Sequence, residues 1–257
     1  MQQNQSDSVI LRNLLITICY DGRNYHGWQI QKNARTVQEI FQNAMYKVLG
    51  KYYDIKGCSR TDSGVHANMY CLSTKIDKKI SCRDLIFAFN RVLPYDICVK
   101  ECREVPLDFH ARYSCKGKEY VYKILNSKIR DPFLHGYVLH YWYPLDISKL
   151  KEASKVYLGK HDFTSFCTID KRDMSNIIKD VRKFEVKKEN NIVEFYIEAD
   201  GFLYNMVRIM IGTLLRVCQN KIKISDMPFI LEARDRSKAG PTAPASGLYL
   251  NKVFYDI

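Results

Sequence analysis

The sequence lacks the phosphate-binding motifs that identify nucleotide-dependent enzymes. No GxGxxG pattern occurs, and no HExxH. Gly22 and Gly27 have the spacing of a P-loop, but Trp28 and Gln29 follow, where Lys and Ser or Thr are needed to hold phosphate and magnesium. A kinase, an NTPase and a dinucleotide-dependent enzyme are therefore excluded, and no nucleotide cofactor is expected.

The sequence also lacks the cysteine spacing of a zinc site. Its nine cysteines include no CxxC pair, and Cys98 and Cys102 are the two closest. No His-x-His or second Cys pair completes a tetrahedral zinc set. We interpret the cysteines as reduced and mostly buried, as in a cytoplasmic protein, and we expect no metal and no other cofactor.

Targeting and membrane-spanning segments are missing as well. Residues 1–8 are polar and have no apolar core like that of a signal peptide. The most apolar helix candidate, residues 204–219, is too short to span a bilayer and carries Arg208 and Arg216. The sequence therefore predicts a cytoplasmic protein without a membrane segment.

Positive charge is present in excess. The chain has 40 Lys and Arg against 28 Asp and Glu, a formal net charge of +12, which attracts polyanions. Nucleic acid is the natural partner, although charge alone does not identify it because many basic proteins bind none. With 46% hydrophobic residues, the 257-residue chain can bury a large core in one large domain or two smaller ones.

Helical and strand periods alternate along the chain, which is typical of an α+β fold. Thr36 and Glu39 form a capping box before an expected helix that ends at Gly50, while Ser81 and Asp146 start two others. Further helices are expected from about residue 204 and from residue 225. Strands are expected over residues 14–20, 69–75, 118–126, 181–187, 192–199 and 248–255.

Strands combined with two helices occur in each half of the chain. We expect a disordered or loosely held N-terminus over residues 1–12, an N-terminal α+β half over 13–105 and a C-terminal α+β half over 106–257. A cleft between two such halves would suit an extended ligand.

Small, polar and charged residues are densest in the loop at residues 57–67, Gly-Cys-Ser-Arg-Thr-Asp-Ser-Gly-Val-His-Ala. Loops of this kind often place reactive groups on a rigid scaffold. Asp62 lies among small residues beside Arg60, so its carboxylate can approach a substrate closely and stay ionised. Composition alone fits an ordinary turn with a surface Arg–Asp pair equally well.

This loop resembles the G-R-T-D-x-G-V-H-A signature of the TruA family of tRNA pseudouridine synthases, with Ser59 where the family has Gly or Ala. Further matches follow in order over essentially the whole chain. They are Tyr20-Asp21-Gly22, Tyr25, Gly27-Trp28-Gln29, Gln31, Phe109-His110-Ala111-Arg112, Lys118-Glu119-Tyr120-Val121-Tyr122, Asp162-Phe163-Thr164-Ser165-Phe166, Phe202, Met206-Val207-Arg208, Gly212 and Ala243-Pro244-Ala245-Ser246-Gly247-Leu248-Tyr249-Leu250. The resemblance implies two similar α+β halves that form a continuous mixed, largely antiparallel sheet with a central RNA-binding cleft.

The resemblance also implies roles for matching residues. Asp62 is implied as the catalytic carboxylate, Tyr120 as the ring stacked on the target uracil, and Arg208 as the cation held against Asp62. Arg208 lies on an otherwise apolar helix, where a buried charge needs a partner. Arg60 and His66 are substrate-binding candidates, although a lone His near a site is more often a hydrogen-bonded structural residue.

Uridine isomerisation breaks an N–C glycosidic bond and remakes it through carbon, without a redox step, energy input or metal. An ionised carboxylate can act as nucleophile or base. Three first steps are open to it: attack on the sugar, attack on the uracil ring, or removal of a ribose proton.

Charged and aromatic residues alternate in the loop before the first helix, a composition that suits phosphate contact and base stacking. A solvated basic loop with Trp28 anchored in the core explains the same pattern nearly as well. The RNA-contact candidates are Arg23, Tyr25, Trp28, Lys32, Arg35, His110 and Arg112.

The family resemblance implies an isomerase that converts uridine to pseudouridine at positions 38, 39 and 40 in the anticodon arm of tRNA, as a homodimer whose tRNA touches both subunits. The target base must leave the stack to be reached. Two alternatives are a metal-dependent nuclease using Asp62, which would need further clustered carboxylates, and a non-catalytic RNA-binding paralogue, which would not need Asp62, Tyr120 and Arg208 all intact.

Overall fold

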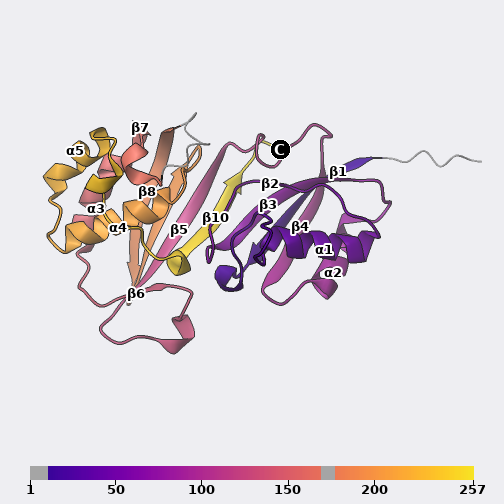
Figure 1. The fold of residues 1–257 in the computed structure, drawn as a ribbon, viewed down its shortest axis with the longest axis horizontal. Helices are drawn as coiled ribbons and strands as arrows, with labels where there is room; N and C mark the ends of the chain where they lie inside the picture. Colours follow the sequence, from indigo (N-terminus) through magenta and orange to yellow (C-terminus); the bar gives the residue numbers. More distant parts are fainter. Residues whose placement is uncertain (1–10, 169–176) are drawn as a thin grey trace, which may run out of the picture.

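The computed structural model describes residues 11–168 and 177–257, and its strands form one sheet (Figure 1). The strand order is β4-β1-β3-β10-β5-β9-β8-β7, with β2 beside β3 and β6 beside β5. Two of the pairings, β3 with β10 and β5 with β6, are parallel, and the others are antiparallel. The predicted α+β class with a continuous, largely antiparallel sheet is confirmed. The expected division at residues 105 and 106 stays a prediction, and residues 1–10 of the expected loose N-terminus lie outside the described residues.

The elements follow one another in an order close to the predicted one. In the first part of the chain they are β1 (Arg12–Tyr20), α1 (Val37–Leu49), β2 (Lys56–Gly57), β3 (His66–Ile76), α2 (Cys82–Val92) and β4 (Ile97–Val105). In the second part they are β5 (Gly117–Asn126), β6 (Leu139–Tyr141), α3 (Ile147–Ser154), β7 (Gly159–Asp162), β8 (Ile178–Glu189), β9 (Ile192–Ala199), α4 (Met206–Cys218), α5 (Met227–Glu232) and β10 (Leu248–Phe254).

Strand β10 joins the two parts of the sheet. It pairs with β3 in parallel through only two residue pairs, His66 with Tyr249 and Ala67 with Leu250. On its other side it runs antiparallel to β5, from Leu248 to Phe254. In Figure 1 this strand (yellow) lies in the middle of the molecule, with α1 and α2 toward one end and α3, α4 and α5 toward the other.

The helix ends show where local sequence signals suffice. Ser81 accepts a hydrogen bond from the backbone N–H of Asp84 (3.1 Å), as an N-cap should, and Gly50 ends α1 with φ of 81°. The capping box predicted at Thr36 is wrong: its hydroxyl is buried and has no hydrogen-bond partner among the described residues. The first two N–H groups of α1 instead donate to the carbonyls of Gly27 (3.2 Å) and Trp28 (3.0 Å), so packing replaces the cap.

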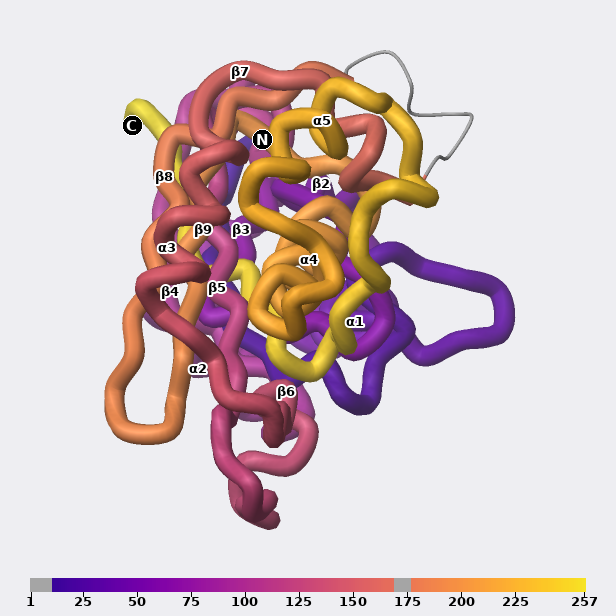
Figure 2. Tube along the Cα trace, turned by 90° about the vertical axis from the view of Figure 1, so that its left-hand side faces the viewer, coloured from indigo at the N-terminus to yellow at the C-terminus, as the bar shows by residue number. Residues whose placement is uncertain are grey.

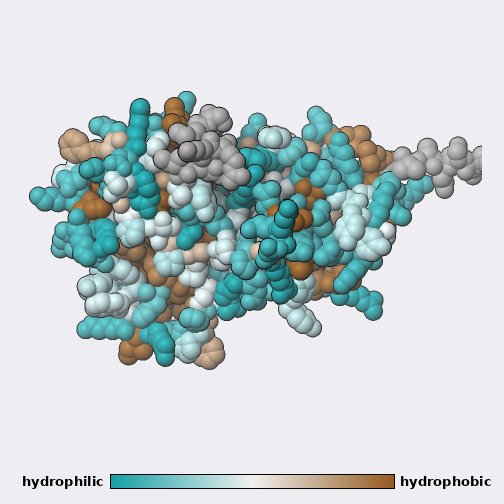
Figure 3. Space-filling model, viewed as in Figure 1, coloured by the Kyte–Doolittle hydropathy of each residue, from teal (hydrophilic) through white to brown (hydrophobic). Residues whose placement is uncertain are grey.

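Each end of the sheet has its own aromatic packing under the helices. Phe41 of α1 and Phe89 of α2 are buried with ring centroids 5.3 Å apart. At the other end Tyr157 packs edge-on against Phe166 at 5.0 Å. Removing a buried ring of this size costs about 3–5 kcal/mol of stability. On the face drawn in Figure 3 hydrophilic residues predominate, with hydrophobic ones scattered among them.

Candidate active site

A cavity of about 830 Å³ lies where the two parts of the sheet meet. The loop with Asp62 lines it from the first part of the chain, and Tyr120 of β5 and the segment around residues 201–207 line it from the second. We call this cavity the central cleft. The structure therefore brings together residues that are separated by more than 140 positions in sequence.

Backbone contacts with the loop before α1 hold Asp62 in place. The carbonyl of Asp62 accepts from the N–H of Val65 (3.1 Å) in a tight turn, and Gly64 supplies a positive φ of 77° in that turn. The backbone N–H of Trp28 donates to the carbonyl of Thr61 (3.2 Å). No residue with a side chain fits at position 27, because a Cβ added to Gly27 would lie 2.3 Å from the carbonyl oxygen of Thr61.

Buried aromatic residues pack against the loop that carries Asp62 and support it. The rings of Trp28 and Tyr70 stack at 4.1 Å, and the Tyr70 hydroxyl donates to the carbonyl of Ser59 (2.6 Å). The hydroxyls of Tyr20 and Thr61 share a hydrogen bond of 2.8 Å. Tyr20, Trp28, Thr61 and Tyr70 are all buried, so the loop with Asp62 is attached to a closely packed base.

The predicted pair between Arg208 and Asp62 is present. Nη1 of Arg208 lies 3.4 Å from Oδ2 of Asp62, and these side chains are 18% and 25% exposed. The guanidinium also donates from Nε to the carbonyl of Ala243 (2.7 Å) and from Nη1 to Oδ1 of Asn205 (2.8 Å). Three acceptors therefore fix the cation, and the carboxylate is one of them.

Close contact between α4 and the segment before β10 sets the position of Arg208. A Cβ added at Gly212 would lie only 1.7 Å from the carbonyl oxygen of Pro241, so only glycine fits. Ala243 N–H also donates to the carbonyl of Arg208 (3.0 Å). Gly212 thus matters for the site although it lines no part of the cleft.

Burial and charge act on Asp62 in opposite directions. Burial is the larger influence and raises the pKa of Asp62 above its ordinary value, while Arg208 lowers it. Protons therefore bind this carboxyl more tightly than in the unfolded chain. Without the guanidinium, the pKa would rise further.

Tyr120 forms part of the cleft wall. Its side chain is 7% exposed, and its ring meets that of Phe202 edge-on at 5.0 Å and 85°. Burial raises the pKa of Tyr120, so its hydroxyl stays protonated at neutral pH. Tyr122, two residues further along β5, is fully buried, and its hydroxyl donates to the carbonyl of Pro244 (2.8 Å).

Among the residues that the structure describes, four cations line the central cleft against the single carboxylate of Asp62. Arg60 and Arg112 are predicted candidates and are exposed. Lys118 of β5 and Lys179 of β8 were missed by the sequence analysis. Strand alternation could have placed Lys118 on the face of Tyr120, whereas a bulge in β8 between Val181 and Lys183 breaks the pattern near Lys179.

The remaining candidates lie elsewhere. Lys32 and Arg35 are exposed, and Arg23 pairs with Asp21 at 2.6 Å. His110 is half-buried and accepts from the N–H of Arg112 (3.1 Å) through Nδ1. The structure places three others in the interior: Tyr25, Trp28 and His66 are 2%, 4% and 1% exposed. Packing in the core accounts for Tyr25 and Trp28, and we do not assign them to RNA.

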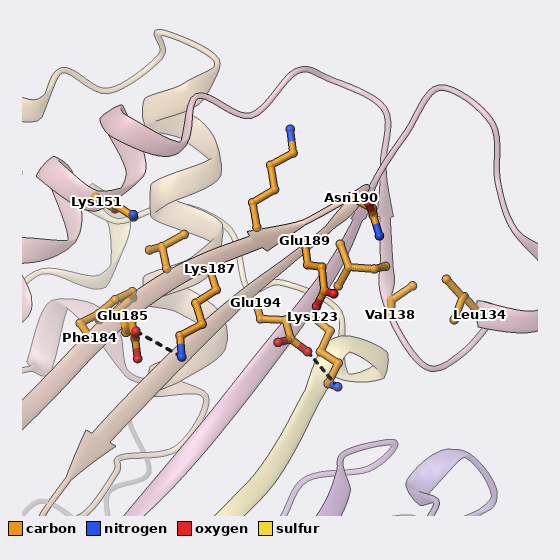
Figure 4. A pocket seen from close by; sticks show the side chains of 13 residues that line it. Lys123, Leu134, Val138, Lys151, Phe184, Glu185, Lys187, Glu189, Asn190 and Glu194 are labelled. Atoms are coloured by element: carbon orange, nitrogen blue, oxygen red, sulfur yellow. Dashed lines mark ion pairs between the residues drawn. The ribbon is translucent and has the colours of Figure 1, made fainter.

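A second cavity, of about 910 Å³, lies between the β8–β9 turn and the segment between β5 and β6 (Figure 4). Both segments extend in the same direction in Figure 2 (orange and magenta). Four lysines and three glutamates line this cavity, and Lys123 pairs with Glu194 (3.0 Å) and Lys187 with Glu185 (3.3 Å). With its charges nearly balanced, this cavity suits a polyanion less well than the central cleft does.

Within residues 11–168 and 177–257, no group of three or more His, Cys, Asp or Glu is placed to hold a metal ion. Over the same ranges, no helix combines the length and the apolar character needed to cross a bilayer.

Comparison with known proteins agrees with the geometry of the cleft. The model of the tRNA pseudouridine synthase family matches residues 16–114 and 153–256, which include Asp62 and Arg208. A "tRNA pseudouridine synthase A" of Thermoanaerobacter sp. (strain X514) is 46% identical over 245 residues, 95% of this chain and 100% of the relative. Another of the same name from Ruminiclostridium cellulolyticum is 44% identical over 246 residues, again 95% and 100%. A match of this extent, over the residues that build the cleft, shows that the chain belongs to the tRNA pseudouridine synthase family.

Proposed function

We propose that this protein converts uridine to pseudouridine at positions 38, 39 and 40 in the anticodon stem-loop of tRNAs, with Asp62 as the catalytic carboxylate. Isomerisation of uridine in tRNA follows from membership of the family. The positions and the residue roles are our assignment. The observation that carries the assignment is the contact of Asp62 with Arg208 at 3.4 Å, at a cleft whose other charged lining residues, among those described, are cations.

The reaction places clear demands on the site. The N1–C1′ bond of uridine breaks, a C5–C1′ bond forms, the proton on C5 leaves and N1 gains one, so atoms and electrons balance without a co-reactant. The site must therefore supply a base or nucleophile and must keep the detached uracil while it turns. Asp62 supplies the first, because its ionised oxygens can act in either way.

Arg208 and Tyr120 provide the surroundings for that step. The guanidinium stabilises the ionised form of Asp62 against burial, which acts in the other direction. Tyr120 and Phe202 present an aromatic wall on which an extruded uracil can stack. The protonated hydroxyl of Tyr120 can donate a hydrogen bond and cannot serve as a base unless it is first deprotonated.

Binding of the RNA backbone falls to the cations of the cleft. Arg60, Arg112, Lys118 and Lys179 lie around Asp62, where they can contact phosphates on both sides of the extruded nucleotide. Lys32 and Arg35 do not line the cleft, but both are exposed on the loop before α1 and can add contacts to the RNA. Phosphate contacts of this kind provide affinity without reading sequence.

We further propose that the protein is a cytoplasmic homodimer. Large apolar side chains are exposed between residues 129 and 143: Ile129 is 80% exposed, Phe133 89% and Trp142 58%. Exposed apolar groups of this size are typical of surfaces that a partner covers. Light scattering of Phe133→Asp and Trp142→Asp variants tests this: the mass of a monomer for the variants and of a dimer for the wild type is expected, and a monomeric wild type contradicts it.

Mapping pseudouridines in cells tests the function. tRNA from cells that lack the protein is treated with carbodiimide and analysed by primer extension. Stops at positions 38, 39 and 40 are expected to disappear and to return when the wild-type gene is restored, but not when the Asp62→Asn gene is. Loss of stops at other positions, with these retained, contradicts the assignment.

A further inference from the structure

His66 lies at the joint between the two parts of the sheet. It is the first residue of β3, directly after the turn that carries Asp62, and its register partner across the joint is Tyr249 of β10. Only two residue pairs join β3 to β10. Because Asp62 comes from one part and Arg208 from the other, the geometry of this joint determines the distance between them.

The His66 ring is 1% exposed, does not line the central cleft and contacts neighbouring groups through both nitrogens and one face. Nδ1 accepts from the N–H of Gly22 (3.1 Å), and Nε2 lies 3.1 Å from the carbonyl oxygen of Gly136. One face stacks on Tyr249 at 4.5 Å. Asp21 Oδ1 lies 3.3 Å from Nδ1.

We propose that His66 is a positioning residue of the isomerisation: as a neutral imidazole protonated on Nε2, it fixes the Asp62 turn against the second part of the chain. The inference rests on the proposed function of the central cleft. It assigns to His66 a role behind the site instead of the substrate contact expected from the sequence.

Hydrogen-bond chemistry determines the form of the ring. The backbone N–H of Gly22 can only donate to Nδ1 and the carbonyl of Gly136 can only accept from Nε2, so these two contacts favour a ring that accepts at one end and donates at the other. Neutral imidazole does both, whereas imidazolium has no acceptor. Asp21, the acceptor 3.3 Å from Nδ1, already has donors in Arg23 and Tyr137. Burial lowers the pKa of His66, which agrees with the neutral form.

The groups around the ring form a second layer that links the same segments. Asp21 holds Arg23 (2.6 Å) and accepts from the Tyr137 hydroxyl (3.0 Å), while the Tyr249 hydroxyl donates to the carbonyl of Tyr137 (2.6 Å). Arg23 lies over the Tyr137 ring at 3.9 Å. Arg23 and Tyr137 thus hold the carboxylate of Asp21. Gly22 lies close to the turn that carries Asp62, since a Cβ added to Gly22 would lie 2.0 Å from the carbonyl oxygen of Val65.

Three variants separate the contacts of the ring. Asn places its oxygen where Nδ1 stands and keeps the acceptor for Gly22; Gln places its nitrogen where Nε2 stands and keeps the donor for Gly136. Phe keeps the stacking on Tyr249 and loses both hydrogen bonds. His161, which is half-buried on β7, outside the central cleft, and makes one backbone hydrogen bond of 2.7 Å and an edge-on contact with Phe163 that Phe can keep, provides the control His161→Phe.

Steady-state kinetics on a tRNA transcript gives the readout. We expect His66→Phe to lower kcat about 10- to 100-fold, because misplacement of reacting groups by about 1 Å costs about that much. KM should change little, because the cations of the cleft are untouched. His66→Asn and His66→Gln should each recover part of the loss, and His161→Phe should match the wild type. A folded His66→Phe enzyme with wild-type kcat, or a loss confined to KM, overturns the inference.

A measurement on the wild type covers the case in which His66→Phe does not fold. Long-range ¹H–¹⁵N NMR of ¹⁵N-histidine-labelled protein, with the His66 signals identified by their absence from His66→Asn, should show a neutral ring protonated on Nε2 at pH 7. A positively charged His66 ring, or a neutral ring protonated on Nδ1, overturns the inference. If the wild type makes no pseudouridine in the kinetic assay, the proposed function fails instead, and the two failures are thus distinguished.

Discussion

Replacing Arg208 by Met tests the electrostatic account of the site. Met keeps apolar bulk on α4 and removes the charge beside Asp62. At the observed separation of 3.4 Å, the attraction between unit charges is about 5 kcal/mol at an effective dielectric constant of about 20. This figure is a ceiling because both side chains remain partly exposed. Hydrogen bonds to charged groups contribute about 1.5–3 kcal/mol, which corresponds to about 10- to 150-fold.

The sign of the effect follows from the direction of each influence. Arg208 lowers the pKa of Asp62, so its loss raises that pKa and reduces the ionised fraction at any pH below the new value. We expect the acid limb of the single-turnover rate of pseudouridine formation to move to higher pH. At pH values below the raised pKa of Asp62, the single-turnover rate should be about 10- to 150-fold lower than that of the wild type. Raising the pH above this pKa should recover part of the activity. Arg208→Lys should move the limb less.

Arg216 provides a matched control on the same helix. It is half-buried and contacts Gln219 at 3.2 Å, outside the cleft, so Arg216→Met should leave the limb in place. Melting curves show whether the variants are folded. If Arg208→Met slows the reaction equally at every pH while folded, Arg208 orients the carboxylate or the RNA and does not control its charge.

Further perturbations address other parts of the site. Asp62→Asn should abolish pseudouridine formation and change the Kd for tRNA little, since phosphate contacts supply most of the affinity; substantial remaining turnover would remove Asp62 from its role. The same variant should raise Tm at pH 7, because the raised pKa of Asp62 means that ionisation destabilises the folded state. The gain should shrink as pH falls through that raised pKa and be gone below the ordinary pKa of Asp, about 3.9; a constant difference at all pH contradicts this. Arg112→Met should reduce the slope of log Kd against log salt by about 0.7–0.9, one phosphate contact, whereas Lys187→Met, outside the central cleft, should not. Activity should survive EDTA treatment while the tRNA stays folded; a loss restored only by one divalent ion would favour the nuclease alternative.

Local signals in the sequence predicted most helices and strands and the Asp62–Arg208 pair at the cleft. Ser81 and Gly50 mark helix ends through contacts within a few residues. The pairing of Arg208 with a carboxylate follows from the cost of an unpaired charge on an apolar helix, so its partner in the conspicuous loop could be expected.

Residues whose surroundings come from distant segments were predicted less well. Thr36 has the composition of a cap, but Gly27 and Trp28 supply the acceptors through tertiary contact. Tyr25 and Trp28 have the composition of an RNA-binding loop and are buried instead. For His66, the partner Tyr249 is more than 180 positions away, and no pattern near His66 indicates that pairing.

The place of β10 in the sheet also bears on how the enzyme is made. Among the described residues, this strand follows every other element in chain order, yet it lies between β3 and β5. During translation the first part of the chain can emerge and pair β1 with β3 and β4, but the strand that lies between β3 and β5 in the sheet is complete only when residues 248–254 have left the ribosome. We therefore expect the contact between Asp62 and Arg208, and with it an active cleft, to form only after the last strand has joined the sheet, so that a partly synthesised chain does not modify tRNA.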